Sequence, residues 1–242
     1  MGERLCVVMP VYNEEGIVGT VVSHWAAMLQ SLGIDFAIYA YNDGSTDNSL
    51  AILQKSAETL GERVHVKNKA NSGHGDTVLG GYREAAADGF EWIFQIDSDN
   101  EMDAEGFDEL WYKRHQYDFL VGRRAGRSQA WARKAVSFVS RLSVRILYGR
   151  SVWDVNSPYR LMRADSFRRF FEMIPEMTFA PNVMLSGLAA YSGMKCLELP
   201  VHCQMRRTGE DSLRKWKLFR SAVISWWQTV RFRILLTRIE MG

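Results

Sequence analysis

The two aspartates of Asp97-Ser98-Asp99 are the residues whose type and spacing most directly suggest chemistry, because they follow at once on the apolar stretch 92–96. Carboxylate oxygens suit hard divalent ions such as Mg²⁺ and Mn²⁺, which proteins commonly hold with one or two carboxylates and the phosphates of a substrate. Glu101 supplies a third carboxylate nearby. An acidic turn exposed to water has the same composition, so this motif alone is a weak signal for a metal and diphosphate site.

Three more polar clusters have the same position relative to an apolar stretch. Residues 10–15 follow the stretch 5–9, residues 42–47 follow 35–41, and residues 71–75 follow 64–66. A single cluster of this kind is an ordinary loop. Four clusters, each directly after a predicted strand, indicate the rim of a ligand-binding site.

Two of these clusters have a structural interpretation as well as a functional one. Asn42-Asp43-Gly44-Ser45 has the composition of a turn that leads into a helix, and Asp43 could in addition accept hydrogen bonds from a nucleobase or a ribose. The segment 71–75 precedes a predicted helix, whose first backbone amides could meet a phosphate. It matches neither G-x-G-x-x-G nor the P-loop pattern, which argues against a dinucleotide oxidoreductase or a P-loop NTPase. A structural and a functional role for His74 are equally open.

The elements that must position these clusters alternate along the first hundred residues. The predicted strands are 5–9, 35–41, 64–66 and 92–96, and the predicted helices are 16–32, 47–60 and 76–87. Strands that alternate with helices of this length are typical of βαβ units in a parallel sheet. Parallel strands end at one edge of the sheet, so we expect the four clusters to lie together there.

The formal net charge of the 242 residues is only +2, but this value averages two oppositely charged halves. Residues 1–120 carry 8 basic and 20 acidic side chains, a net charge of −12, whereas residues 121–242 carry 22 basic and 8 acidic ones, a net charge of +14. This asymmetry suggests that the second half meets an anionic partner. Because 47% of the residues are hydrophobic and 24% charged, the chain can bury a core, which excludes the disordered and low-complexity classes.

The basic residues of the second half fall in two regions. Between positions 123 and 169 there are twelve basic side chains and only two acidic ones, Asp154 and Asp165. From residue 212 the spacing predicts one or two amphipathic helices, with an apolar stripe made of Leu213, Trp216, Phe219, Val223, Trp226, Trp227, Val230 and Ile234. Basic, aromatic-rich helices of this kind often lie on anionic membrane surfaces, and packing on the chain's own domain is an equal alternative here.

The remaining composition narrows the cellular setting. Cys6, Cys196 and Cys203 are too few and too scattered for a disulfide framework or a four-ligand zinc site, which favours a reducing compartment. The uncharged runs 16–34 and 177–194 are not expected to span a membrane, because the first has the spacing of an amphipathic helix and the second contains Pro181 and Gly187. No signal peptide is expected.

Five motifs, taken in order, resemble the family 2 glycosyltransferases of the GT-A fold. They are V-M-P-V-Y-N-E-E at 8–15, N-D-G-S-T-D-N-S at 42–49, N-S-G-H-G at 71–75, D-S-D-N at 97–100 and D-V-N-S-P-Y-R-L at 154–161. The most similar branch is the dolichyl-phosphate mannose synthase-like enzymes, which move a sugar from a nucleotide diphosphate to a polyprenyl phosphate, and Arg206-Arg207-Thr208-Gly209 resembles the R-x-x-G element of that branch. The resemblance implies an α/β fold with a mostly parallel, Rossmann-like sheet flanked by helices and followed by C-terminal amphipathic helices.

The resemblance also implies roles for individual residues. The nucleoside pocket would be lined by Pro10, Tyr12, Glu14 and Asp43, and the diphosphate and a Mn²⁺ or Mg²⁺ ion would be bound by Asp97, Asp99 and Glu101. The acceptor phosphate would be held by Arg124 and Arg133, the donor phosphates would lie near Arg206, and the acceptor side would be shaped by Asp154 and Arg160. The residues expected to be catalytic are therefore Asp99, Arg124, Arg133, Asp154 and Arg206. Asn42, Glu101 and Pro158 depart from the family's usual residues, so the base and sugar preferences stay open.

The implied chemistry is consistent with these residue types. A divalent ion with a nearby arginine can neutralise the charge that develops on a leaving nucleotide diphosphate. An acceptor phosphate is already anionic near neutral pH and needs little help from a base, and arginine forks match its geometry. If the acceptor were instead a saccharide or protein hydroxyl, a carboxylate base would be needed, for which Asp154 is the candidate. Direct displacement at the anomeric carbon predicts inversion.

We therefore expect two units, a glycosyltransferase domain at 1–205 and a basic amphipathic segment at 206–242. The expected partners are a GDP- or UDP-sugar, a polyprenyl phosphate and the cytoplasmic face of a membrane, where the chain would lie peripherally. A separate membrane subunit is a further candidate. Nucleic acid is not an expected partner, since a basic nucleic-acid footprint would leave the four polar clusters unexplained.

Overall fold

A seven-stranded sheet forms the centre of the protein in the computed structural model, which describes residues 3–125, 131–149, 152–203 and 215–241. Its strands are β1 (Arg4–Val11), β2 (Asp35–Asp43), β3 (Val64–Lys69), β4 (Trp92–Gln95), β5 (Phe119–Ala125), β6 (Arg160–Arg163) and β7 (Cys196–His202). Their order is β3-β2-β1-β4-β6-β5-β7, and β6 alone of these strands runs antiparallel to its neighbours. The predicted mostly parallel sheet is confirmed.

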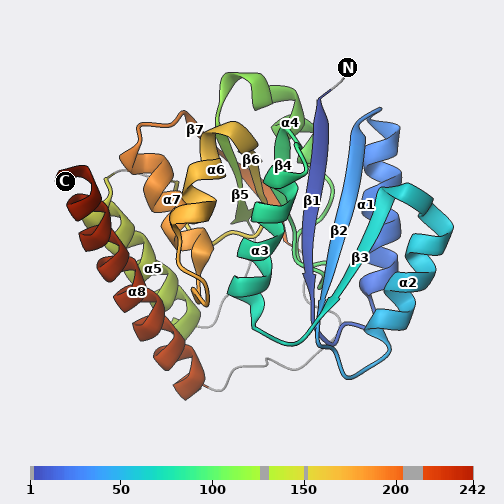
Figure 1. Cartoon of the computed structure of the whole chain (residues 1–242), viewed down its shortest axis with the longest axis horizontal. Coiled ribbons are helices and arrows are strands. Elements are labelled where there is room, and N and C mark those ends of the chain that lie inside the picture. The colour runs from blue at the N-terminus through green and yellow to red at the C-terminus, as the bar shows by residue number, and fades with distance from the viewer. Residues whose placement is uncertain (1–2, 126–130, 150–151, 204–214, 242) are drawn as a thin grey trace.

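Helices cover both faces of this sheet (Figure 1). They are α1 (Val18–Ser31), α2 (Ser49–Leu60), α3 (His74–Ala87), α4 (Phe107–Lys113), α5 (Trp131–Leu147), α6 (Ala164–Met173), α7 (Pro181–Tyr191) and α8 (Lys215–Met241). Apolar side chains of α1, α2 and α4 share one hydrophobic core, whereas those of α3, α5, α6, α7 and α8 share the other. The architecture is thus three layers, with α5 and α8 side by side at one end of the molecule.

Strand β1 shows why the sequence forms a sheet buried on both sides. Leu5, Val7 and Met9 point into the core beneath α1, while Cys6 and Val8 point into the core beneath α3. Side chains of a strand alternate between faces, so a strand covered on both faces reads as a continuous apolar run. This run is the signal by which the sequence predicts the strand.

The order of elements in the first hundred residues is as predicted. Each of the four predicted strands and three predicted helices is present, with ends displaced by only a few residues. The later strands have no comparable sequence signal, because β6 has only four residues and Arg160 and Arg163 stand at its two ends. In the second half the sequence therefore predicted the C-terminal helix, present as α8, but not the strands.

Helix α8 packs on the domain with a face that the sequence pattern did not predict. The residues that it buries include Ser225, Thr229, Phe232 and Leu236, whereas Trp226 and Trp227 are 45% and 60% exposed. The hydroxyl of Tyr148 on α5 donates to the Thr229 carbonyl at 3.0 Å, and Arg233 Nε donates to the Leu147 carbonyl at 2.8 Å. Among the residues of the predicted apolar stripe whose side chains the structure describes, Val223, Trp226, Trp227 and Ile234 are exposed.

Three expectations about the chain as a whole can be compared with the structure. The cysteines are free thiols. Within the described ranges, no helix combines the length and the hydropathy needed to cross a bilayer. The expected unit boundary at residues 205 and 206 falls within the segment 204–214, which lies outside the described residues, so the division into two units stays a prediction.

Candidate active site

The four polar clusters meet at the carboxyl edge of the sheet, which is the lower end of β1 in Figure 1. A cleft of about 390 Å³ opens there. It is lined by Pro10, Val11, Tyr12, Glu14, Asp43, Asn71, Gly73, His74, Asp97, Ser98 and Asp99. Six residues expected to contact the donor are thus brought together in one cavity, which we call the donor cleft.

Asp43 is held by the loop between β3 and α3. Its Oδ1 accepts hydrogen bonds from Lys69 Nζ at 2.6 Å and from the Ser72 amide at 2.9 Å, and its Oδ2 accepts from the Gly73 amide at 3.0 Å. Burial raises the pKa of this carboxyl, but the bonds from Lys69 and the loop outweigh it and hold the pKa below its usual range. Asp43 also lines the cleft, so the carboxylate that orders this loop lies at the wall of the cavity.

The two loops that carry Tyr12 and Asp43 are tied to each other. The Asn13 amide donates to Ser45 Oγ at 3.0 Å, the Glu14 amide donates to Ser49 Oγ at 2.8 Å, and the Thr46 amide donates to Asn13 Oδ1 at 2.8 Å. Asn13 has a left-handed backbone with φ of 54°, which a short polar residue tolerates best. These bonds shape the nucleoside end of the donor cleft before any ligand binds.

Asp97 lies between a histidine and a buried amide. His74 Nε2 is 3.1 Å from Asp97 Oδ1, and Gln95 Nε2 donates to the same oxygen at 3.4 Å. Desolvation raises the pKa of Asp97, but the charge and hydrogen bond of His74 outweigh it, and the pKa is lowered. Desolvation conversely lowers the pKa of His74, and Asp97 raises it above its usual value. The structure therefore places His74 in the site, where the sequence left its role open.

A buried polar network lies behind Asp97. Asn182 Nδ2 donates to Gln95 Oε1 at 2.7 Å, and the Tyr82 hydroxyl is 2.5 Å from Gln95 Oε1 and 2.9 Å from Asn182 Oδ1. Every member is buried. Satisfied networks of this kind fix side-chain positions, so Gln95 is a positioning residue for Asp97.

Asp99 and Glu101 follow on the same loop. The Glu101 amide donates to Asp99 Oδ1 at 3.0 Å. Asp97, Asp99 and Glu101 line one small hollow together with Met102 and Pro158. Across the described residues, however, no three His, Cys, Asp or Glu side chains form a cluster that could hold a metal by themselves. A metal here would need other ligands, which suits an ion that shares its coordination with diphosphate and water.

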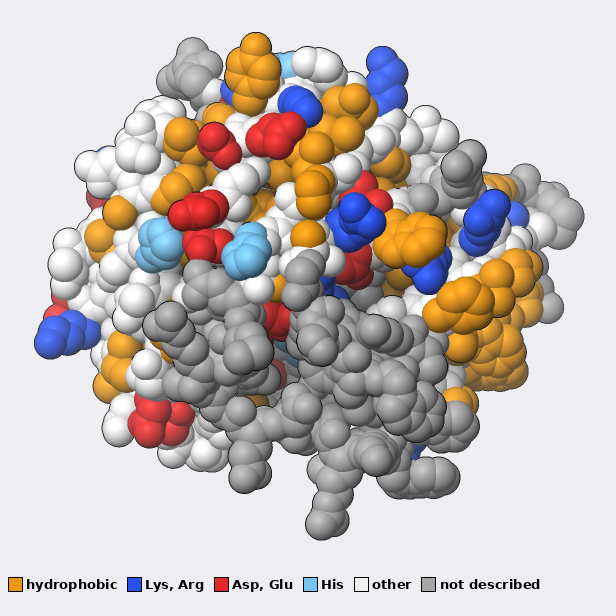
Figure 2. All heavy atoms as spheres, turned by 180° about the vertical axis from the view of Figure 1, so that it is seen from behind, with side chains coloured by type: hydrophobic (Ala, Val, Ile, Leu, Met, Phe, Trp, Pro, Cys, Tyr) orange, Lys and Arg blue, Asp and Glu red, His pale blue; other side chains and the backbone are white. Residues whose placement is uncertain are grey.

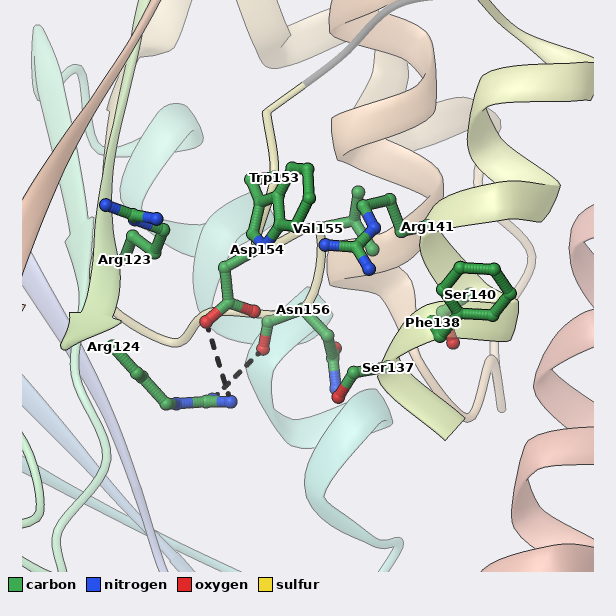
Figure 3. Close-up of a pocket in the computed structure, with 10 residues that line it drawn as sticks. All are labelled: Arg123, Arg124, Ser137, Phe138, Ser140, Arg141, Trp153, Asp154, Val155 and Asn156. Atoms are coloured by element: carbon green, nitrogen blue, oxygen red, sulfur yellow. Dashed lines mark hydrogen bonds and ion pairs between the residues drawn. The ribbon is translucent and has the colours of Figure 1, made fainter. Parts of the chain in front are cut away.

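Arg124, at the end of β5, faces the carboxylates from the other side. Its Nη1 is 3.7 Å from Asp154 Oδ2, and its Nη2 donates to the Asn156 carbonyl at 3.4 Å (Figure 3). The buried Nε has no hydrogen-bond partner. Burial lowers the pKa of this guanidinium, but the carboxylates of Asp154 and Glu101 outweigh it and raise the pKa. Arg124 therefore stays charged.

Two further cavities extend from the donor cleft through Arg124. The central cavity, of about 320 Å³, is lined by His74 and Asp97, which it shares with the donor cleft, and by Arg124 and Asn156. Arg124 and Asn156 also line an outer groove of about 430 Å³. The other residues of this groove are Arg123, Ser137, Phe138, Ser140, Arg141, Trp153, Asp154 and Val155 (Figure 3).

The outer groove combines cationic and aromatic groups in a fixed arrangement. The guanidinium of Arg141 stacks 3.6 Å from the Trp153 ring centroid. Glu198 on β7 accepts hydrogen bonds from the backbone amides of Trp153 and Asp154, at 3.1 and 2.8 Å. Glu198 is thus a positioning residue for the loop that carries Asp154, although nothing in its sequence context indicated this.

Arg160 supports the same loop from inside the protein. It is fully buried, and its guanidinium donates to the carbonyls of Ser157, Val155 and Asn182. Burial lowers its pKa to about 10, so it is still charged at neutral pH. These bonds fix the loop from inside the protein, and a role of Arg160 in shaping the acceptor side stays a prediction.

The last two predicted arginines cannot be assigned to the site. Arg133 lies in the first turns of α5, in a stretch where the backbone alone is described, and Arg206 lies outside the described residues. Conversely, sequence reasoning missed Lys69, Gln95, Trp153 and Glu198. Lys69 could have been recognised from the sequence as a candidate site residue, because it stands between the predicted strand 64–66 and the polar cluster 71–75. The others are recognised only by their contacts.

All residues of the donor cleft, and the ion pair of Arg124 with Asp154, lie in the part of the chain that matches a known family. A profile of the family described as "Glycosyl transferase family 2" matches residues 6–171. The chain belongs to glycosyl transferase family 2.

A curated member of similar sequence is the undecaprenyl-phosphate 4-deoxy-4-formamido-L-arabinose transferase of Enterobacter sp. (strain 638), which is 28% identical over 210 residues. The alignment covers 86% of this family 2 chain and 62% of the relative, so the chain spans less than two thirds of the relative's length.

Solved structures support the fold. Mannosyl-3-phosphoglycerate synthase from Rubrobacter xylanophilus superposes with a TM-score of 0.66 at 13% identity, covering 99% of this chain and 75% of that one. Glucosyl-3-phosphoglycerate synthase from Mycobacterium tuberculosis, in complex with Mn²⁺, UDP-glucose and phosphoglyceric acid, has a TM-score of 0.62 at 16% identity and coverages of 96% and 80%. The expected GT-A-like architecture of this family 2 protein is confirmed.

Proposed function

We propose that this protein is a metal-dependent, inverting glycosyltransferase that moves a sugar from a nucleotide diphosphate sugar to a polyprenyl phosphate. The observation that carries the proposal is the series of three cavities, which runs from the carboxylates of the donor cleft past Arg124 to the outer groove with its arginines and aromatic rings. The relative's activity on undecaprenyl phosphate supports the choice of acceptor.

The donor would bind in the donor cleft. Tyr12, which is half exposed there, would contact the base, and Asp43, which lines the same cleft, would accept a hydrogen bond from the base or ribose. Asp97 and Asp99 would hold Mn²⁺ or Mg²⁺ together with the diphosphate, and their oxygen donors fit either ion. When bound, the ion would neutralise charge on the departing nucleotide diphosphate.

The acceptor would approach from the outer groove. Arg123, Arg124 and Arg141 all line this groove, so an acceptor phosphate would meet several guanidinium groups. A phosphate that is already anionic needs no base, and Arg124 would hold it in line for attack at the anomeric carbon. Attack from that side predicts inversion.

The aromatic face of α8 supports association with a membrane surface. Val223, Trp226, Trp227 and Ile234 are exposed on α8, and Phe138, Leu142 and Ile146 are exposed on α5 beside it. Figure 2 shows hydrophobic side chains gathered, with cationic ones among them, on the side where α5 and α8 lie. An exposed apolar patch of this size with basic residues is typical of a surface that meets an anionic membrane. We infer peripheral binding, at the cytoplasmic face, and keep a separate membrane subunit as a second proposed partner.

A hydroxyl acceptor is the second candidate, because the Asp154 carboxylate also lines the outer groove and could act as a base. The three arginines that line the same groove, Arg123, Arg124 and Arg141, favour the phosphate, because guanidinium groups match an anionic acceptor.

One experiment tests the donor and the acceptor in sequence. UDP-sugars and GDP-sugars are first compared by thermal shift with and without Mn²⁺, because a ligand that binds only the folded state raises the unfolding temperature. The donor that stabilises the protein is then supplied in radiolabelled form with undecaprenyl phosphate or with soluble glycans. Label that partitions into the organic phase supports the proposal. Label that stays wholly aqueous with the glycans contradicts it and supports the hydroxyl acceptor.

A further inference from the structure

The side chain of Gln228 on α8 clamps a loop that belongs to another part of the molecule. The Phe179 amide donates to Gln228 Oε1 at 2.9 Å, and Gln228 Nε2 donates to the Met177 carbonyl at 3.3 Å. One amide side chain therefore satisfies a backbone donor and a backbone acceptor of the segment 177–179, as a neighbouring strand would.

The clamped segment lies directly against the start of α3. The Met177 amide donates to Asp76 Oδ1 at 3.0 Å, and Met177 has a left-handed backbone with φ of 56°. A Cβ added at Gly75 would lie 2.3 Å from the Thr178 carbonyl oxygen and 2.4 Å from that of Phe179. The two backbones are thus in contact with no side chain between them, so a displacement of the loop must displace the start of α3.

The start of α3 and the clamped segment are both walls of the central cavity. His74, Gly75 and Asp76 line it from one side, and residues 177–182 line it from another. His74 contacts Asp97, and Asn182 belongs to the network that positions Asp97 through Gln95. The position of the segment 177–179 is therefore transmitted to the carboxylates of the donor cleft by two routes.

The other side of α8 faces away from the domain. Residues on both sides of Gln228 along the helix, Trp227 and Arg231, are exposed, whereas Thr229 and Phe232 are buried against the domain. Gln228 sits at the border between these two faces. Its side chain therefore joins the helix to residues that line the central cavity.

We propose that Gln228 is a positioning residue that couples the exposed face of α8 to the donor cleft, so that binding of α8 to an anionic membrane and binding of the nucleotide strengthen each other. The coupling rests on the proposed function above. Its physical basis is conformational entropy. A helix held at a membrane surface fixes Gln228 and with it the segment 177–179, so that nucleotide binding then loses less conformational entropy. Linkage requires the effect to be equal in both directions.

The experiment compares the wild-type chain with Gln228→Ala and Gln228→Glu. Gln30→Ala is the control, because Gln30 is an exposed glutamine in the last turn of α1. Hydrogen exchange of peptides covering 175–180 and 73–78 is measured without ligand. The affinity for UDP and for GDP, each with Mn²⁺, is measured by calorimetry with and without vesicles that contain phosphatidylglycerol.

We expect Gln228→Ala to speed exchange at Phe179 at least tenfold and to loosen 73–78, and Gln228→Glu, which keeps an acceptor oxygen, to protect Phe179 nearly as well as the wild type. Vesicles should tighten nucleotide binding by the wild type and by Gln30→Ala at least about fivefold, the lower end of typical couplings. In Gln228→Ala the factor should fall below about twofold.

Three results separate the possible failures. Unchanged exchange at Phe179 in Gln228→Ala overturns the inference, and so does a vesicle effect that is equal in the wild type and in Gln228→Ala. A wild type that binds neither nucleotide contradicts the proposed function, and the exchange data then decide the clamp alone. If Gln228→Ala does not fold, Gln228→Glu carries the comparison: it loses the donor to the Met177 carbonyl, so its vesicle effect should be smaller than that of the wild type, and an equal effect overturns the inference.

Discussion

Asp43 and Asp97 illustrate what a residue's neighbours add to its type. Both are aspartates at the ends of parallel strands, and both have lowered pKa values, but Asp43 owes this to Lys69 and two loop amides, whereas Asp97 owes it to His74. The sequence predicts that these carboxylates belong to the site, because the ends of the strands can be recognised from the apolar pattern. It does not predict that Lys69 and His74 are their partners, since each partner comes from a different strand or helix. The hydrogen bonds of Asp43 therefore mainly hold the loop between β3 and α3. Asp97 uses Oδ1 for its hydrogen bonds, so its Oδ2 is available to bind a ligand.

Replacement of Asp99 by asparagine should abolish most of the proposed transfer. The change keeps the size and one oxygen but removes the charge that would help to hold a divalent ion, so we expect a loss of at least about 100-fold in kcat. The rate of label transfer to undecaprenyl phosphate measures it. Asp108→Asn, on α4 and away from the donor cleft, is the control. Equal activity of Asp99→Asn and the control would remove Asp99 from the site.

The bond between Lys69 and Asp43 should stabilise the protein in a pH-dependent way. The pKa of Asp43 is lowered in the folded state, so its contribution is fully present above the unfolded value near 3.8 and is lost as the pH falls through the folded pKa. Lys69→Met should therefore reduce the free energy of unfolding by about 1–3 kcal/mol at pH 7, and by progressively less below about pH 4. Urea unfolding at several pH values tests this, with exposed Lys55→Met as the control. An effect of equal size at pH 7 and pH 3 would be inconsistent with it.

At the scale of elements, the site depends on loops that are fixed by contacts between distant segments. The loop after β1 is tied to the loop after β2, Glu198 on β7 holds the loop at 153–154, and the start of α3 packs on 177–179. The sequence indicates each loop but not its partner, because a hydrogen bond between residues far apart in the chain leaves no periodic pattern in the sequence. The glycine at position 75 shows this most sharply.

Gly75→Ala should disturb the site far more than another glycine-to-alanine change on the same helix. Its Cβ would meet the backbone oxygens of residues 178 and 179 inside contact distance, so α3 and the segment must separate. We expect a loss of about 1–3 kcal/mol in unfolding free energy and weaker nucleotide binding. Gly80→Ala, with nothing within 4 Å of the added Cβ, should instead stabilise α3 by about 0.5–1 kcal/mol. Chemical denaturation of both variants measures this, and equal effects would refute the close approach.

At the scale of the whole molecule, the two charge halves have different positions in the fold. The acidic half supplies β1 to β4 and most of the donor cleft, and the basic half supplies Arg124, the outer groove, and helices α5 and α8 at one end. The near-zero net charge thus conceals a molecule with an anionic ligand edge and a cationic, aromatic end. This arrangement makes a specific prediction about surfaces.

Binding to anionic vesicles should depend on Trp227 and on salt. Trp227 is 60% exposed, so Trp227→Ala should leave the unfolding free energy nearly unchanged but weaken partitioning roughly tenfold, through lost apolar burial. Raising the salt from about 0.05 to 0.5 M should also weaken it, because the Debye length shortens. Co-sedimentation with phosphatidylglycerol vesicles measures both. Tyr112→Ala, 79% exposed on α4, is the control and should have no effect. Equal binding to neutral and to anionic vesicles would contradict the predicted dependence on charge.

The sequence by itself determined the alternation of the first four strands with three helices, the edge at which their polar loops meet, and the family resemblance that those loops carry. These features are local, since hydrophobic period and loop composition act over a few residues. The tertiary structure decided which groups are partners: Lys69 for Asp43, His74 for Asp97, Glu198 for the Asp154 loop and Gln228 for the segment 177–179. It also decided that α8 turns Ser225 and Thr229 inward and Trp226 and Trp227 outward. A helical pattern specifies two faces, but only the shape of the neighbouring helices selects the face that is buried.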